Sequence, residues 1–242
     1  MARMCMIGLT VLFSFQLAGA KDFLRNYTLE PGGQVFIENV LGDISVKSYK
    51  GDSIEIVGKK KGDGSDLIEV VDASTGNRIE IRIRPTQFPG GNARIDFEIR
   101  VPKAIEYNFT RIFSFSGNVY IEGVAGRLRA ESVRGSVALK DVKGHVSAMS
   151  FSGNINVDIG NTQDRGSMMF SSISGSIDVS ASSDLNALVD ISCSSGLLRT
   201  DFPLEIQELR YGPGRSARGR LGAGMQILHI RSVTGRVNLI KK

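Results

Sequence analysis

Tryptophan is absent from the 242-residue sequence, and aromatic residues make up only 7% of it. Sites for sugars and nucleobases commonly stack their ligands on aromatic rings, so the sequence offers few platforms for either ligand. Charge of one sign is not concentrated, because 30 Lys and Arg and 25 Asp and Glu are spread along the chain and give a net charge of +5. This distribution does not indicate a nucleic-acid interface, and no nucleic-acid partner is expected.

Cysteine and histidine are also scarce. Cys5 and Cys193 allow one disulfide at most, and His145 and His229 lie far apart in the sequence. Neither histidine has ligands at metal-binding spacing, so no metal or other cofactor is expected. His145 is interpreted as a surface side chain, and Cys193 as a buried structural thiol rather than a nucleophile.

The first twenty residues resemble a secretory signal peptide. Arg3 gives a basic start, residues 4–17 are mostly apolar, and residues 18–20 read Ala-Gly-Ala, a cleavage site before Lys21. A membrane anchor is the alternative, but the apolar run is short for a span of about 20 residues. We therefore expect residues 1–20 to be removed and the mature protein to be exported to the periplasm, the cell surface or the medium.

A glycine repeat predicts short strands. Gly117, Gly126, Gly135, Gly144 and Gly153 are spaced nine residues apart. The second and fourth residues after repeat glycines are apolar in every case but Thr200; they include Ile44, Val46, Val119, Ile121, Leu128, Ala130, Val137, Leu139, Val146, Ala148, Ile155, Val157, Ile177, Val179, Leu198, Val237 and Leu239. Alternation of this kind is typical of strands with one buried face.

A longer repeat is superimposed on the first. The tetrad Ser-apolar-x-Gly occurs at residues 114–117, 132–135, 150–153, 172–175 and 232–235, and we interpret 193–196 and 216–219 as degenerate copies. Units of 18 to 22 residues predict an all-β parallel β-helix or solenoid, in which each coil buries its apolar face on the next. An antiparallel sandwich is the alternative.

The second residue of each tetrad is expected to point inward. Phe115, Val133, Phe151, Ile173 and Val233 would then form one buried column, in which Cys193 takes an equivalent place. Such a column requires like coils stacked in register, which favours the solenoid for residues 113–242. The tetrad serines are expected to hydrogen-bond local backbone at the coil corners.

Residues 21–112 are predicted to form a β-rich segment that caps the solenoid. Apolar and charged residues alternate over 78–84 and again over 94–101, on either side of a loop at 85–92. This pattern predicts an amphipathic hairpin whose charged face carries cross-strand pairs. A cap would cover the open first coil, whose unpaired backbone otherwise offers an edge for self-association.

Several segments resemble one family. The segments 42–46 (Gly-Asp-Ile-Ser-Val), 99–102, 117–126 and 232–237 are similar, in this order, to the DUF4097 family of bacterial candidate adhesin domains. The resemblance covers most of the mature chain. It implies an exported or envelope-associated β-solenoid, it offers no catalytic motif to transfer, and some relatives are linked to envelope-stress systems.

The basic stretch at residues 210–220 departs from the family pattern. Arg210, Arg215, Arg218 and Arg220 could form an anion-binding loop for groups such as lipid headgroups. A flexible basic loop without a ligand is the alternative.

Two functions remain from different classes. The favoured one is a non-catalytic envelope protein, adhesin-like or scaffolding, whose partner is an envelope protein, a glycan or an anionic lipid. The alternative is a carbohydrate-active β-helix enzyme, a polysaccharide lyase or hydrolase. Asp141, Asp158 and Asp178 are its nearest candidate acids, although they stand at different offsets from their glycines.

Overall fold

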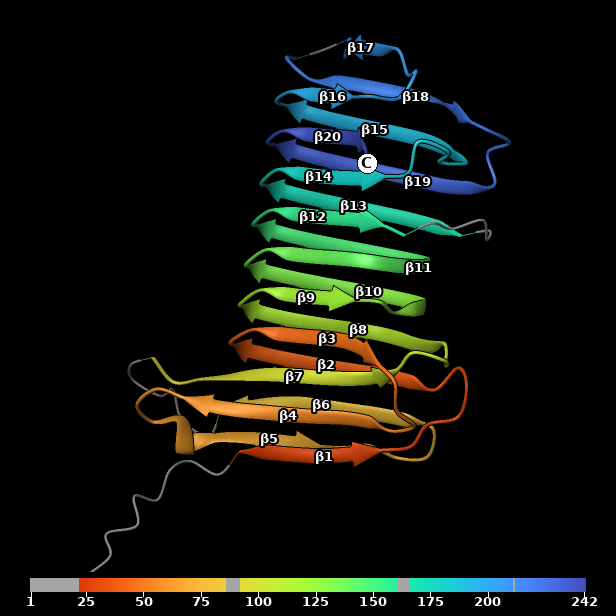
Figure 1. The fold of residues 1–242 in the computed structure, drawn as a ribbon. Helices are drawn as coiled ribbons and strands as arrows, with labels where there is room; N and C mark the ends of the chain where they lie inside the picture. The colour runs from red at the N-terminus through yellow and green to blue at the C-terminus, as the bar shows by residue number, and fades with distance from the viewer. Residues whose placement is uncertain (1–21, 86–91, 161–165, 211) are drawn as a thin grey trace, which may run out of the picture.

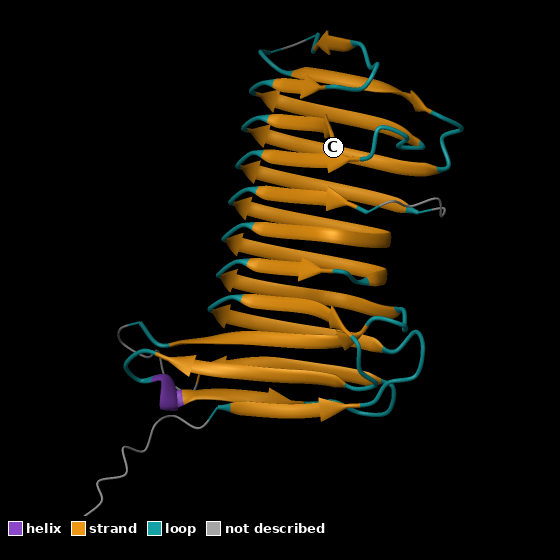
Figure 2. Ribbon diagram, viewed as in Figure 1, coloured by secondary structure: helices purple, strands orange, loops and turns teal. Residues whose placement is uncertain are grey.

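The computed structural model describes residues 22–85, 92–160, 166–210 and 212–242. Within these ranges the chain forms twenty strands and one 3-10 helix, η1 (Ser65–Leu67), so the protein is all-β. The strands lie one above another in a tall stack (Figures 1 and 2). No helix in the described ranges is long and apolar enough to cross a bilayer. The predicted signal peptide at residues 1–20 lies outside the described residues.

The stack has two sheets. In spatial order, sheet A contains β1 (Phe23–Tyr27), β4 (Ile54–Lys61), β7 (Arg94–Pro102), β3 (Ile44–Tyr49), β9 (Val119–Glu122), the first part of β11 (Val137–Ser152), β12 (Ile155–Ile159), β14 (Ile177–Ala181), β20 (Val237–Lys241) and β16 (Leu198–Thr200). Sheet B contains β5 (Ile68–Asp72), β6 (Arg78–Pro85), β2 (Gln34–Leu41), β8 (Tyr107–Ser116), β10 (Ala125–Arg134), the second part of β11, β13 (Ser167–Ser174), β19 (Gln226–Thr234), β15 (Ala187–Ser195), β18 (Arg215–Leu221) and β17 (Ile206–Glu208).

Most of the stack is built from a repeating unit that we call a rung. A rung is a strand of sheet B, a tetrad corner and a strand of sheet A, and neighbouring rungs pair in parallel. In the middle of the stack Ser132 lies opposite Ser150, which is an offset of 18 residues along the chain. The parallel pairing rules out the antiparallel sandwich for the rungs.

The spatial order of the rungs differs from their order in the sequence. The β19–β20 rung lies between β13–β14 and β15–β16, although β15 and β16 precede it in the chain. The tetrad at 193–196 forms a corner of the stack, as predicted. The copy expected at 216–219 was wrong, because these residues lie within β18, which runs antiparallel to β15.

The residues predicted to face inward from the glycine repeat do so. Val137 and Leu139 are 0% and 2% exposed, whereas Lys140, the next residue along β11, is exposed. The other apolar residues at the second and fourth positions after the repeat glycines are buried as well. The alternation therefore identified the core of both sheets.

The inward column predicted from the tetrads was wrong. Phe115 and Phe151 are 42% and 56% exposed, whereas the tetrad serines Ser114 and Ser150 are fully buried. The strand ends at the third tetrad residue, and the glycine and the residue after it make the corner between the sheets. Because the chain bends there, the alternation does not continue across the corner, and the serine faces inward instead.

The strands of the N-terminal segment were predicted correctly, but their pairing was not. The strands β6 and β7 form no hairpin with each other: β6 pairs with β2 and β5 in sheet B, and β7 pairs with β3 and β4 in sheet A. Their charges therefore meet other strands, as in the ion pairs Lys59–Glu98 and Arg84–Glu69. The loop at residues 86–91 lies outside the described residues.

Candidate binding surfaces

The corner of each rung is fixed by a hydrogen bond to the next rung. Ser150 Oγ donates to the carbonyl oxygen of Gly135 at 3.0 Å. Equivalent bonds to the tetrad glycine of a neighbouring rung come from Ser114, Ser132, Ser172, Ser232 and the Cys193 thiol. At one end Asn39 takes the place of the serine and donates to the carbonyl oxygens of Gly42 and Ile95. The serines thus bond the backbone of the adjacent rung, not of their own corner. We call this row of tetrad serines and their bonds the serine ladder.

The glycine of each tetrad is required by close packing between rungs. A Cβ atom on Gly153 would lie 2.2 Å from the carbonyl oxygen of Gly135, and one on Gly117 would lie 2.0 Å from that of Gly42. These distances are far below van der Waals contact, so a larger residue would force the rungs apart. The corners consequently form a regular and rigid edge.

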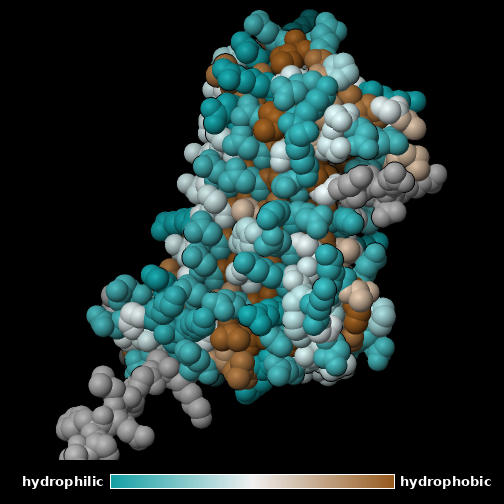
Figure 3. Space-filling model, in the orientation of Figure 1, coloured by the Kyte–Doolittle hydropathy of each residue, from teal (hydrophilic) through white to brown (hydrophobic). Residues whose placement is uncertain are grey.

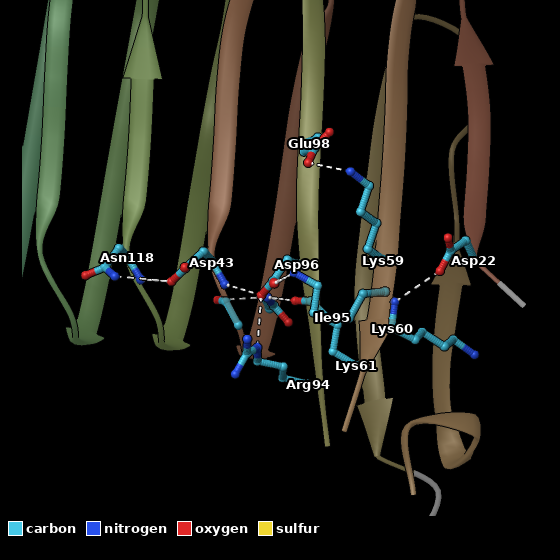
Figure 4. A network of polar contacts seen from close by, with 12 residues as sticks. Asp22, Asp43, Lys59, Lys60, Lys61, Arg94, Ile95, Asp96, Glu98 and Asn118 are labelled. Carbon is cyan, nitrogen blue, oxygen red and sulfur yellow. Dashed lines mark hydrogen bonds and ion pairs between the residues drawn. The ribbon is translucent and has the colours of Figure 1, made fainter. Parts of the chain in front are cut away.

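A polar network ties the N-terminal strands to the rungs (Figure 4). The Asp96 carboxylate accepts from the amide of Asp43 at 3.1 Å and lies 2.8 Å from Lys61 Nζ. Asp43 in turn accepts from the amide of Asn118 at 2.7 Å. Burial raises the pKa of Asp96, but the bonds from Lys61 and Asp43 and the charge of Arg94 outweigh burial, so the pKa is lowered overall.

An apolar ridge runs along the outside of the corners. We use this name for the second residues of successive tetrads, Phe115, Val133, Phe151, Ile173 and Val233. Phe151, Ile173 and Val233 are 56%, 44% and 47% exposed, and the register of the tetrads places neighbouring members on adjacent strands, about 4.8 Å apart. The face of the molecule shown in Figure 3 is mostly hydrophilic.

The four arginines of residues 210–220 do not form a loop together. Arg215, Arg218 and Arg220 belong to strand β18, whereas Arg210 precedes it. Arg218 and Arg220 are exposed, and Arg218 Nε lies 3.1 Å from Asp190 Oδ1. Arg215 is half-buried on the opposite side of the strand, beside Cys193 in register. A joint anion site of these four residues remains a prediction.

Two of the three candidate catalytic acids share a depression on sheet A. Asp158 and Asp178 line a hollow of about 360 Å³, on the neighbouring strands β12 and β14. Asp178 accepts from Asn238 Nδ2 at 2.5 Å, and Asp158 contacts Lys242 Nζ. Asp141 does not line this hollow. Within the described ranges, no three His, Cys, Asp or Glu side chains converge as metal ligands.

The scarce cysteine and histidine side chains lie as follows. Cys193 is fully buried, as predicted, but it lies opposite Ser232 in the serine ladder and not in the apolar column. Burial raises the pKa of its thiol. His145 is exposed on β11, as predicted, and His229 Nδ1 lies 3.9 Å from Asp190 Oδ2.

Sequence reasoning missed one group of polar residues. Arg127 and His145 each follow a repeat glycine, Gly126 and Gly144, and lie side by side in the register of β10 and β11. The spacing of 18 residues between them was the signal that could have placed them together. They line a hollow that is described below.

A solved structure with a TM-score of 0.50 shares this fold. Among solved structures, a candidate cell adhesion protein from Clostridium sporogenes has a TM-score of 0.50 at 12% identity, over 92% of this chain and 100% of that chain. A candidate adhesin from Bacteroides fragilis has a TM-score of 0.44 at 15% identity, over 91% and 98% of the two chains. At such low identity, the similarity to the Clostridium protein concerns the fold alone.

No curated protein matches the sequence. The family model named Toastrack DUF4097 matches residues 33–211, which is well over half of the chain. The resemblance that the glycine-rich segments indicated is thereby confirmed, and the protein belongs to the Toastrack DUF4097 family.

Proposed function

We propose that this protein is an exported, envelope-associated β-solenoid that acts by binding, in the manner of an adhesin, and catalyses no reaction. The parallel rungs, the serine ladder and the close-packed glycine corners support a solenoid, because each feature repeats from rung to rung. The similarity to candidate adhesion proteins is in keeping with this function.

The apolar ridge is the observation that carries the proposal. Phenylalanine, isoleucine and valine side chains lie outside in register at successive corners, where about half of Phe151, Ile173 and Val233 is exposed to water. Exposed apolar residues that form a continuous row are typical of interaction sites, whereas single ones are common on any surface. A straight row on a rigid edge suits a binding partner that follows the stack axis.

The carbohydrate-active enzyme remains the second candidate, because Asp158 and Asp178 face one depression. Glycoside hydrolysis needs two carboxyl groups at a fixed separation on either side of the substrate. Here each carboxylate is already engaged by a neighbouring side chain, Asn238 or Lys242. This arrangement supports a structural role for both acids.

The binding function can be tested with envelopes isolated from the producing organism. The variant Phe115→Ser/Phe151→Ser/Ile173→Ser should sediment with envelopes much less than the wild type does. The control Ser152→Ala/Ser174→Ala alters exposed neighbours in the same tetrads and should sediment normally. Equal sedimentation of the ridge variant and the control would contradict the proposal.

Export and catalysis are tested separately. The mature protein should be recovered outside the cytosol with Lys21 as its first residue. Recovery from the cytosol with Met1 retained would contradict export. Polysaccharide cleavage by the purified protein that is abolished by Asp158→Ala or Asp178→Ala would establish the enzyme instead.

A further inference from the structure

A basic hollow lies at the corner opposite the tetrads, where strands β8 and β10 begin on the right of Figure 1. It has a volume of about 610 Å³, and its lining includes Asn108, Arg127, Lys143 and His145. A second hollow of about 400 Å³ shares Asn108, Arg127 and His145 with the first and continues across the strands to Ser147, Ser167 and Met169. The two therefore form one trough that crosses β8, β10, β11 and β13.

Glycines form the floor of the basic hollow. Gly126 and Gly144 have φ angles of 113° and 95°, which strongly favour glycine. A Cβ atom on Gly126 would lie 2.3 Å from the carbonyl oxygen of Tyr107, and one on Gly144 would lie 2.4 Å from that of Gly126. Since no side chain can rise here, the neighbouring Arg127, Lys143 and His145 stand above an open floor.

The cationic groups of the basic hollow differ from the arginines nearer the tetrad corner, of which Arg129 lines the second hollow. On the outer face of β8 and β10, Arg111 and Arg129 both pair with Glu131, at 3.0 and 2.6 Å. By contrast, no carboxylate in the part of the chain that the structure describes lies within ion-pair distance of Arg127 or Lys143. Glu106 also lines the hollow, but Arg127 and Lys143 together outweigh the charge of this one carboxylate, so the lining keeps an excess of positive charge.

The two ends of the trough differ in chemistry. Arg127 and Lys143 lie at one end beside the imidazole of His145, and guanidinium and ammonium groups bind carboxylates or phosphates. Arg129, Met169, Ser147 and Ser167 line the other end. Arg129 is paired there with Glu131, and the hydroxyls of Ser147 and Ser167 can bond to the hydroxyl groups of a ligand. Four adjacent strands span about 14 Å, since neighbouring strands lie about 4.8 Å apart. A single small anion is much shorter than this span, so it would contact the cationic end alone.

We propose that this trough binds an acidic polysaccharide, with one carboxylate at Arg127 and Lys143 and the hydroxyl groups of the next sugar over Ser147 and Ser167. The assignment deepens the proposed binding function by naming a ligand class, and it uses residues far from the apolar ridge. Lys143 and Arg127 hold the carboxylate of one sugar, and the end that contains Ser147 and Ser167 holds the next sugar along the chain.

The test is calorimetric binding of tetragalacturonate to the full mature protein at low and at high salt. The wild type should bind it at low salt, and salt should weaken the binding because exposed charges are screened. Arg127→Gln/Lys143→Gln should weaken binding at least tenfold. The control Arg231→Gln/Arg236→Gln removes the same charge from exposed sites elsewhere and should change it less than twofold.

Three further results would overturn the proposal. One is equal weakening by both double variants, which would show a nonspecific charge effect. Another is the absence of binding at low salt. The third is tighter binding of polyphosphate or of phosphatidylserine vesicles than of tetragalacturonate, which would mean that the hydroxyl end is unused. The ridge variant should bind tetragalacturonate normally, so failure of this proposal is distinguishable from failure of envelope binding.

Discussion

The hydroxyl of Ser150 donates to the carbonyl oxygen of Gly135 in the next rung, and the Ser150 side chain is fully buried. Ser150→Ala should lower the free energy of unfolding by about 1 to 2 kcal/mol, because the carbonyl oxygen of Gly135 loses its donor. Urea denaturation measures this change. Ser152→Ala, in the same tetrad but exposed, should change stability by less than about 0.5 kcal/mol. Equal effects of the two variants would contradict the inward direction of Ser150.

The close approach of rungs predicts a strong effect at the tetrad glycine. Gly153→Ala should destabilise the protein by about 2 kcal/mol or more, because the new methyl group would overlap the backbone of Gly135. Gly219→Ala in β18 is the matched control, since only the tip of the flexible Leu204 side chain lies near its Cβ position. Thermal unfolding of both variants tests the argument, and a stable Gly153→Ala protein would refute it.

The reversal of the tetrads can be tested with two phenylalanines. Phe170→Ala should cost on the order of 3 to 5 kcal/mol, because this side chain is fully buried. Phe151→Ala should cost less than about 1 kcal/mol, because more than half of the ring is in water. If Phe151→Ala were as destabilising as Phe170→Ala in chemical denaturation, the ridge would have to face inward, as the sequence first indicated.

The carboxylate of Asp96 predicts a dependence of stability on acid. Because its pKa is lower in the folded than in the unfolded chain, its contribution is present above the unfolded value of about 3.9 and is lost as the pH falls through the folded value. Asp96→Asn should therefore reduce the loss of stability between about pH 5 and pH 2. Asp184→Asn removes the same charge at an exposed site and is the matched control in acid unfolding.

The sequence predicted the core better than it predicted the connections. Val137 and Leu139 were identified because alternation within one strand depends only on local geometry. Phe115 was misplaced because the bend at Gly117 resets the alternation, and a repeat of residue types does not reveal which side of a corner faces inward. The pairing of β6 and β7 failed for a different reason: strands adjacent in sequence often pair, but here each found a partner in a different sheet.

The candidate sites were harder to predict than the core. The spacing of Arg127 and His145 contained the necessary information, but their significance depends on the neighbouring carboxylates, which only the structure locates. For residues 210–220 the composition was correct and the conformation was not, since β18 turns its alternate side chains to two sides. Charge counts describe a segment, whereas a site requires side chains that converge.

The placement of β19 and β20 has a consequence for how the chain acquires its structure during synthesis. These strands leave the ribosome after β15 to β18, yet they lie between β13 and β15 in sheet B and between β14 and β16 in sheet A. Growth by adding one finished layer after another cannot produce this order. The segment 182–225 cannot pair with the rest of the stack until β19 and β20 (residues 226–241) have been synthesised. We therefore expect the two parts to join the stack together, in one late step.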